Sequence, residues 1–141
     1  MKETILAISG RPGLFRLVGQ GNRNLIVETL DAERKRMPAG QRDRVTSLGD
    51  VSMYSDDDDV PLMQVFQNLF DALKGQAVDL KLKTATNDQL SEVMAKALPN
   101  YDRDRVHFSD IRKLIQWYNI LVREGLTDFV SKDEESKEEK Q

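Results

Sequence analysis

Short apolar runs separated by turn-forming residues dominate the first third of the chain. Glycine, proline and asparagine cluster between the runs at intervals of about ten residues, and these residue types favour tight turns. The runs are rich in branched aliphatic side chains, which favour strands. Strands are predicted at residues 4–9, 14–18, 24–30, 34–37, 45–48 and 51–54, the last two as a strand pair or one bent strand. This pattern predicts a small SH3-like β-barrel or a bent meander.

The rest of the chain changes to the spacing of amphipathic helices. Helices are predicted at residues 60–74, 86–98 and 109–125. Thr86 and Gln89 have capping-box spacing at the start of the second helix, and Ser109 is expected to cap the third. Between the first two helices, apolar and charged residues alternate over residues 76–83. That alternation fits either a half-buried strand or an extended linker.

The third predicted helix carries apolar residues on more than one side. Its main stripe consists of Ile111, Leu114, Ile115, Tyr118, Leu121 and Val122. At about 100° per residue, Trp117 lies about 100° from the centre of that stripe and Ile120 about 160° from it. The stripe can pack on the two earlier helices, whereas the other side needs a cover from the β-rich part or from another subunit. Trp117 and Ile120 are therefore the candidate partner-binding residues.

These patterns together predict an α+β fold in which a small β-barrel-like domain or bent meander is followed by a three-helix unit. The boundaries are placed at residues 1–58 for the β-rich domain and 60–130 for the helical domain. Residues 131–141 contain only charged and polar side chains with an acidic balance. We expect this tail to be disordered, because it has no apolar surface to bury.

Composition removes several classes of function. The 141 residues include no cysteine and one histidine, which argues against disulfides, thiol nucleophiles and Cys- or His-rich metal sites. The N-terminal apolar run is too short for a signal peptide, and no run approaches the ~20 apolar residues of a membrane span. We therefore expect a cytoplasmic protein that does not enter a membrane.

The acidic run Asp56–Asp59 is a candidate for a divalent cation, since hard cations prefer carboxylates. It lacks the spaced ligands and the glycine of an EF-hand loop. The ordinary interpretation is favoured, namely acidic residues at the start of a helix, where the helix dipole stabilises negative charge. No metal ligand is predicted.

Asp102, Asp104 and His107 are the candidates for acid–base chemistry. Arg103 and Arg105 alternate with the two aspartates, which fits a salt-bridged turn leading into the third helix. No serine or cysteine nucleophile pattern accompanies His107, so a hydrogen-bonded structural histidine is the favoured interpretation. We predict no catalytic residue, no cofactor and no enzymatic activity.

A basic group is the best candidate for contact with a polyanion. It consists of Arg34, Lys35, Arg36, Arg42 and Arg44. Residues 1–55 carry nine Lys/Arg and six Asp/Glu, a balance of 9 − 6 = +3 within a chain of net charge −3. Two basic loops on a small β domain can grip phosphates, although charge that protects a sheet edge is the more ordinary interpretation.

The ISGRPGL turn and the stretch LPNYDRDRV, SDI and WYN carry a resemblance over nearly the whole chain except the tail. In these segments the sequence resembles a family of short uncharacterised bacterial proteins found in the Bacteroidetes. The resemblance implies a β-rich N-terminal domain of unknown function and a helical C-terminal domain. It implies no activity, substrate or catalytic residue.

The functional hypothesis is a non-enzymatic binding or adaptor protein that acts through protein–protein contacts. It depends on the surplus apolar surface around Trp117 and Ile120, covered either by a protein partner or by self-association. The alternative is nucleic-acid binding through the basic group. A structure separates these ideas by showing what covers Trp117 and where the basic side chains lie.

Overall fold

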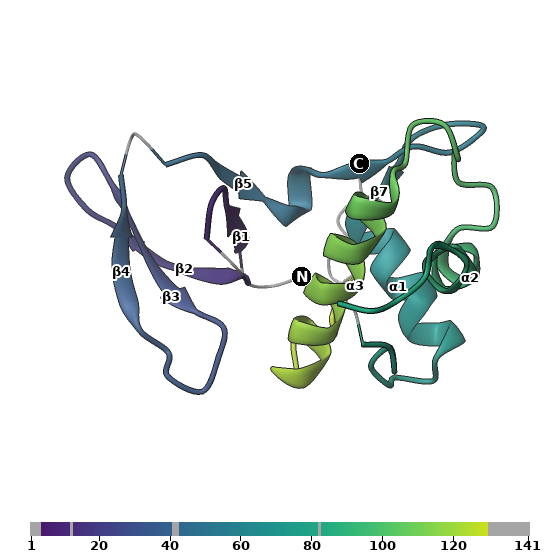
Figure 1. The fold of residues 1–141 in the computed structure, drawn as a ribbon. Coiled ribbons are helices and arrows are strands. Elements are labelled where there is room, and N and C mark those ends of the chain that lie inside the picture. The colour runs from purple at the N-terminus through teal and green to yellow at the C-terminus, as the bar shows by residue number, and fades with distance from the viewer. Residues whose placement is uncertain (1–3, 12, 41–42, 82, 130–141) are drawn as a thin grey trace, which may run out of the picture.

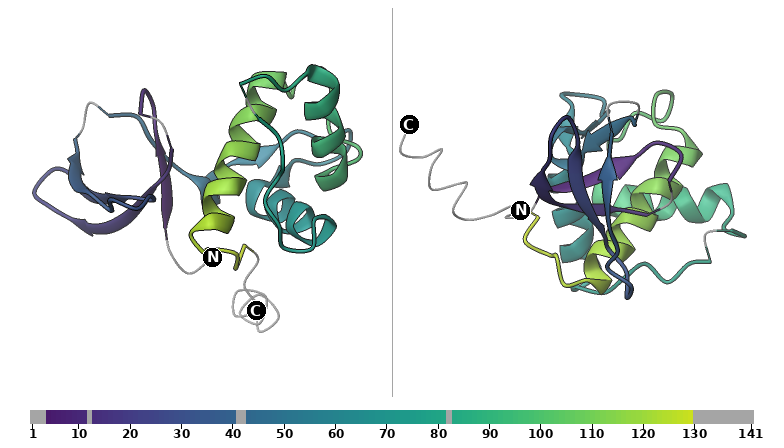
Figure 2. Two further views of the ribbon diagram at one scale, coloured as in Figure 1. Left: turned by 60° about the horizontal axis from the view of Figure 1, so that its bottom comes forward. Right: turned by 90° about the vertical axis from the view of Figure 1, so that its left-hand side faces the viewer.

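A computed structural model describes residues 4–11, 13–40, 43–81 and 83–129 of the chain. A five-stranded sheet comes first in the chain and a unit of three α-helices follows it (Figure 1). The expected α+β class is confirmed. Helix α3 (Phe108–Arg123) stands between the sheet and the other two helices, as the further views in Figure 2 also show.

The sheet is antiparallel throughout and runs in the order β4-β3-β2-β1-β5. Its strands are β1 (Ile5–Ile8), β2 (Phe15–Gln20), β3 (Leu25–Thr29), β4 (Arg36–Ala39) and β5 (Val45–Ser47). Strands β4 and β5 are the two edges and do not pair with each other, so the sheet is open and is not a closed SH3-like barrel. Strands β1 to β4 form a meander, and β5 crosses to the far edge to pair with β1. Closure fails because β5 is only three residues long and leads directly into a 3-10 turn, η1 (Leu48–Asp50).

Side chains on the two faces of β1 are buried in two different hydrophobic cores. Leu6 and Ile8 point into a small cluster with Phe15 and Val27. Ile5, on the opposite face of the same strand, is buried in the core that the helices build. Because successive side chains of a strand point to opposite faces, one short strand joins the two halves of the molecule.

The helical unit contains α1 (Leu62–Ala72), α2 (Asn87–Ala97) and α3. It also includes a two-stranded hairpin of β6 (Ser52–Met53) and β7 (Val60–Pro61), so α1 begins two residues later than expected. Three aromatic residues meet in its centre, where Phe129 lies 5.5 Å from Phe66 and 6.1 Å from Tyr118 between ring centroids. The helical core therefore depends on residues that follow α3 as well as on the helices.

The capping box predicted for α2 is confirmed. Thr86 N–H donates to the Gln89 side chain at 2.9 Å, and Gln89 N–H donates to the Thr86 hydroxyl at 3.2 Å. The cap predicted for α3 was wrong: His107, not Ser109, precedes the helix. The Asp110 carboxylate accepts a hydrogen bond from His107 N–H at 3.1 Å, which fixes the start of α3 earlier than the sequence suggested.

The connection between α1 and α2 is an extended linker, and the described part of residues 76–83 contains no strand. Asn119 of α3 holds it through the backbone of Val78, accepting from N–H at 2.8 Å and donating to the carbonyl at 3.3 Å. The Tyr118 hydroxyl donates to the Gln76 carbonyl at 2.8 Å. Side chains of α3 thus supply the hydrogen bonds that a neighbouring strand would have supplied.

Residues 51–61 lie with the helical unit, because Ser55 bridges Tyr101 and Leu62 N–H donates to the Val51 carbonyl. The tail, residues 131–141, falls outside the described residues. No helix in the described part of the chain is long and apolar enough to cross a membrane.

Candidate binding groove between the sheet and α3

The side of α3 that faces the sheet carries the two candidate partner-binding residues. Ile120 is buried, with 9% of its surface exposed. A Cβ atom on Gly13 would lie 4.0 Å from Ile120 Cδ1, so the turn between β1 and β2 is its neighbour. Trp117 is half-buried and packs against the helical core. The protein's own sheet therefore supplies part of the cover that this face of α3 requires.

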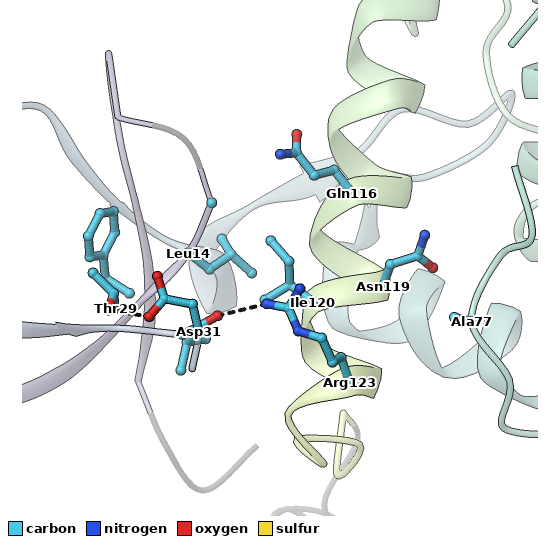
Figure 3. A pocket seen from close by; sticks show the side chains of 11 residues that line it. Leu14, Thr29, Asp31, Ala77, Gln116, Asn119, Ile120 and Arg123 are labelled. Carbon is cyan, nitrogen blue, oxygen red and sulfur yellow. Dashed lines mark hydrogen bonds between the residues drawn. The ribbon is translucent and has the colours of Figure 1, made fainter. Parts of the chain in front are cut away.

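A hollow of about 630 Å³ lies beside Ile120 at the junction of the two parts (Figure 3). Its walls are Gly13, Leu14, Phe15, Thr29, Leu30, Asp31, Ala77, Gln116, Asn119, Ile120 and Arg123. Leu14 and Ile120 point toward one another across it, and Arg123 reaches from α3 to donate to the Leu30 carbonyl at 3.0 Å. We call this space the junction hollow.

A second hollow of about 510 Å³ lies further toward the start of α3. Its walls are Ala7, Ile8, Ser9, Gly10, Arg11, Gly13, Arg44, Thr46, Lys113, Gln116 and Trp117. We call it the turn hollow, because the turn after β1 forms one side. It shares Gly13 and Gln116 with the junction hollow, so the two spaces are neighbours along α3. Together they form the α3 groove, which follows α3 from Lys113 to Arg123 for about 15 Å.

Asp31 is the acidic residue of the junction hollow, and its carboxylate is already occupied. It accepts from the Thr29 hydroxyl at 2.8 Å and from the backbone N–H groups of Glu33 and Arg34 at 3.0 Å each. These hydrogen bonds, that of Thr29 first, lower the pKa of Asp31 below its ordinary value. Asp31 is therefore a charged turn-forming acceptor at neutral pH and not a proton donor.

The turn hollow is basic. Arg11, Arg44 and Lys113 line it, and none of its lining residues is acidic. Arg11 lies 3.9 Å from the Asp43 carboxylate. Arg44 and Lys113 are exposed, and their side chains make no hydrogen bond or ion pair with the rest of the described chain. Two positive charges thus face this hollow without a carboxylate partner.

The other members of the basic group do not join Arg44. Arg34 lies 2.8 Å from Glu124, Arg36 lies 3.2 Å from Glu28 and Lys35 lies 3.2 Å from Glu33. Arg42 lies outside the described residues. The charges of the β3–β4 connection are therefore paired with carboxylates of the protein itself.

The acid–base candidates form a salt-bridged turn. The Asp102 carboxylate accepts from Arg105 Nε at 2.8 Å and from the N–H groups of Asp104 and Arg105, and the Arg105 hydrogen bond is the main cause of a lowered pKa of Asp102. His107 is exposed at the start of α3. Asp56–Asp59 form the loop between β6 and β7, and the described residues bring together no group of three or more potential metal-ligating side chains.

Sequence reasoning missed two of the cations of the groove, Arg11 and Lys113. Lys113 and Trp117 are four residues apart on α3 and therefore lie on one face, a signal that was available from the sequence. Arg11 lies in a turn flanked by Gly10 and Gly13, both with positive φ (84° and 79°). The direction of that turn toward α3 could not be read from local sequence.

An open antiparallel sheet joined to a three-helix unit, with a groove between them, defines a two-part α+β protein. Residues 51–121 match the family described as Domain of unknown function (DUF6852), and the chain belongs to this family. Residues 3–48 match a second family, Domain of unknown function (DUF5606). The resemblance seen in the sequence is confirmed, and the two matched ranges divide the chain between residues 48 and 51.

A solved structure of similar fold comes from Bacteroides vulgatus, determined by solution NMR within a structural genomics programme. It is 50% identical in sequence, with a TM-score of 0.76, over 92% of this chain and 91% of that chain. Among curated proteins, none matches this chain. The comparisons therefore establish the family and the fold.

Proposed function

We propose that this protein is a non-enzymatic binding protein that holds an extended segment of a partner protein in the α3 groove. The observation that carries the proposal is that the two hollows lie next to each other along one face of α3 and share Gly13 and Gln116 as walls. A groove of about 15 Å accommodates four or five residues of extended chain at about 3.3 Å per residue. Its length therefore suits a short linear segment better than a compact small molecule.

The lining of the groove supports a polypeptide as the occupant. Leu14 and Ile120 offer apolar surface in the junction hollow, and Trp117 offers a large ring in the turn hollow. Gln116 lies between the two hollows and is exposed, so its amide can hydrogen-bond to a partner backbone. Buried aromatic residues with polar neighbours are the usual anchors of protein interfaces.

The titratable groups support binding rather than catalysis. A general acid or base works best with a pKa near the operating pH. Asp31, in the groove, and Asp102, outside it, both have lowered pKa values and hold hydrogen bonds from their own turns. These carboxylates serve local structure, and the hydroxyl–carboxylate pair that lines the groove, Thr29 with Asp31, is held within its own turn, where the Thr29 hydroxyl also accepts from Lys35 N–H at 2.9 Å.

The paired state of the β3–β4 cations argues against the nucleic-acid alternative. A phosphate contact gains affinity when an unpaired cation releases the counterions of the nucleic acid. Arg34, Lys35 and Arg36 already lie within 4 Å of Glu124, Glu33 and Glu28. Binding a phosphate there would mean giving up these ion pairs. The protein-binding proposal needs no such rearrangement, and a cytoplasmic location remains a prediction.

Site-specific photo-crosslinking tests the proposal. A p-benzoylphenylalanine at position 116 places the reactive group in the middle of the groove, whereas the same residue at position 96 lies on the exposed side of α2. Irradiation in the producing cell should give a discrete protein adduct from position 116 and none from position 96. Trp117→Ala in the same chain should reduce that adduct severalfold. Equal labelling from both positions, or adducts to nucleic acid, would refute the proposal.

A further inference from the structure

We infer that the turn hollow is a subsite for an anionic group, a carboxylate or a phosphoryl group, carried by the bound segment. The inference rests on the proposed function, because it assigns a chemistry to one end of the same groove. Three cationic residues from separate elements line this space: Arg11 in the turn after β1, Arg44 immediately before β5 and Lys113 on α3. The Arg11 guanidinium also donates to Met37 Sδ at 3.0 Å, so Arg44 and Lys113 are the two of these cations whose side chains are unpaired in the described chain. Local sequence alone does not bring them together.

The charge balance of the hollow differs from that of the neighbouring surface. Arg34, Arg36 and Arg105 each lie within 4 Å of a carboxylate of the protein. Arg44 and Lys113 have no such partner in the described chain, and no acidic residue lines the hollow. The closest compensation is Asp43, which lies 3.9 Å from Arg11. The hollow therefore keeps a net positive charge that a ligand can neutralise.

Backbone contacts hold these cations in place. Ser9 N–H donates to the Arg44 carbonyl at 2.9 Å, which fixes the residue before β5 beside the turn. Gly10 has a φ of 84°, and a Cβ built on it would meet nothing within 4 Å, so the backbone of the turn is open to a ligand. Lys113 precedes Trp117 by four residues, so the two residues lie on the same face of α3. A charged group and an apolar surface are thus adjacent.

The arrangement suits one anionic group rather than a nucleic-acid backbone. A guanidinium recognises the paired oxygens of a carboxylate or phosphoryl group with two parallel N–H bonds, and a lysine adds a point charge. A nucleic-acid strand instead requires cations repeated along a track. The cations with unpaired side chains line one hollow. In the adjoining junction hollow, which contains Asp31, Arg123 donates to the Leu30 carbonyl at 3.0 Å and lies 3.5 Å from the Glu124 carboxylate. We therefore assign the anionic group to a side chain of a bound protein segment.

Trp117 is the single tryptophan of the chain and lines the hollow, so its fluorescence reports local charge directly. Measured relative to the neutral model N-acetyltryptophanamide, the ratio of iodide to caesium quenching should be about four at about 0.1 M salt, as expected for two unpaired positive charges within about 8 Å after screening by the salt. The double variant Arg44→Gln/Lys113→Gln should bring the ratio to about one. Lys96→Gln, at an exposed position on α2, should leave it unchanged. A wild-type ratio near one would overturn the inference.

Ligand probes then identify the source of the anion. A capped peptide of alternating leucine and glutamate should shift Trp117 emission, with at least tenfold weaker binding for the leucine–glutamine peptide and for the double variant. Inorganic phosphate should compete with the acidic peptide if the subsite accepts phosphoryl groups, and a failure to compete restricts the subsite to carboxylates. Tighter binding of a single-stranded oligonucleotide than of the acidic peptide would overturn the assignment to a protein segment.

The two proposals can fail separately. Crosslinking from position 116 without any iodide preference would support the groove as a protein-binding site and refute the anionic subsite. An iodide preference without crosslinking would support the anionic subsite and refute the proposal of a partner protein. Arg44 and Lys113 are exposed, and their side chains make no hydrogen bond or ion pair within the described chain, so we expect the variants to fold. Far-ultraviolet circular dichroism of each variant checks this.

Discussion

Arg34 and Glu124 are 90 positions apart in the sequence, and their side chains meet at 2.8 Å across the junction of the sheet and α3. Arg34 lies in the connection between β3 and β4, and Glu124 follows the last residue of α3. Together with the hydrogen bond from Arg123 to the Leu30 carbonyl, this pair links the sheet to the end of the helix that forms the groove. Both contacts join the sheet to the end of α3 beside the junction hollow.

Breaking the Arg34–Glu124 pair should loosen the junction without unfolding the chain. The Arg34 side chain is 46% exposed and that of Glu124 is 10% exposed. A double-mutant cycle with Arg34→Ala and Glu124→Ala should therefore give a coupling free energy of about 0.5–1 kcal/mol in urea denaturation, more than a fully exposed pair gives. The Lys35–Glu33 pair, exposed on both sides, is the matched control and should show almost no coupling. Equal coupling in both cycles would contradict a structural role for Arg34.

Glu28 should be the most sensitive ionic residue of the sheet. Its carboxylate is 11% exposed and lies 3.6 Å from Arg16, 3.8 Å from Arg34 and 3.2 Å from Arg36. Glu28→Gln leaves several positive charges close together without their common counter-ion, so we expect a loss of about 2–4 kcal/mol in the free energy of unfolding. The exposed Glu33→Gln should change it by less than about 0.5 kcal/mol. Urea denaturation at neutral pH measures both.

The elements of the fold were readable because they depend on local spacing. Apolar periodicity located all three helices, and the Thr86 and Gln89 pair marked the start of α2 to the residue. The cap prediction for α3 was wrong because the Asp110 carboxylate accepts from His107 N–H, so the helix begins at Phe108 and Ser109 lies inside its first turn. Local rules determine helices well and their first residues less well.

The groove could not be predicted because each of its walls comes from a distant part of the chain. Ile120 meets Gly13 and Leu14 only after the sheet has docked on α3. Whether the two edge strands pair with each other likewise depends on the direction of β5. After β5, η1 turns the chain toward the helices. Periodicity identified Ile120 as surplus apolar surface, but it could not tell whether the same chain or a partner would cover it.

Asn119 should hold the linker between α1 and α2. Its side chain makes both hydrogen bonds to the Val78 backbone, so Asn119→Leu leaves that N–H and carbonyl without partners. We expect a loss of about 1–3 kcal/mol in the free energy of unfolding and faster hydrogen exchange of the Val78 amide. Gln67→Leu, which removes an exposed side-chain bond to Asp71 on α1, is the control and should be nearly neutral. Unchanged exchange at Val78 would show that another contact holds the linker.

Asp102 should make stability depend on pH in the acid range. Its pKa in the folded protein lies below the ordinary value of 3.8, first because Arg105 donates to it. A carboxyl group with a depressed folded pKa stabilises the fold above its unfolded pKa, and that stabilisation disappears as the pH falls through the folded pKa. Asp102→Asn should therefore be less stable than the wild type near neutral pH and equal to it in strong acid. Asp104→Asn, which removes a neighbouring carboxylate while leaving the Arg105–Asp102 hydrogen bond in place, is the control in the same urea titrations.

Trp117 and Ile120 should separate binding from stability. Ile120 is buried between α3 and the turn at Gly13, so Ile120→Ala should lower the free energy of unfolding by about 2–4 kcal/mol. Trp117 is half-buried and lines the groove, so Trp117→Ala should cost less stability than Ile120→Ala and should abolish most of the crosslinked adduct from position 116. Urea denaturation and adduct yield, measured on the same variants, give the comparison. Complete unfolding of the Trp117→Ala chain would place the indole in the core, and an adduct yield that follows stability alone would remove Trp117 from the binding surface.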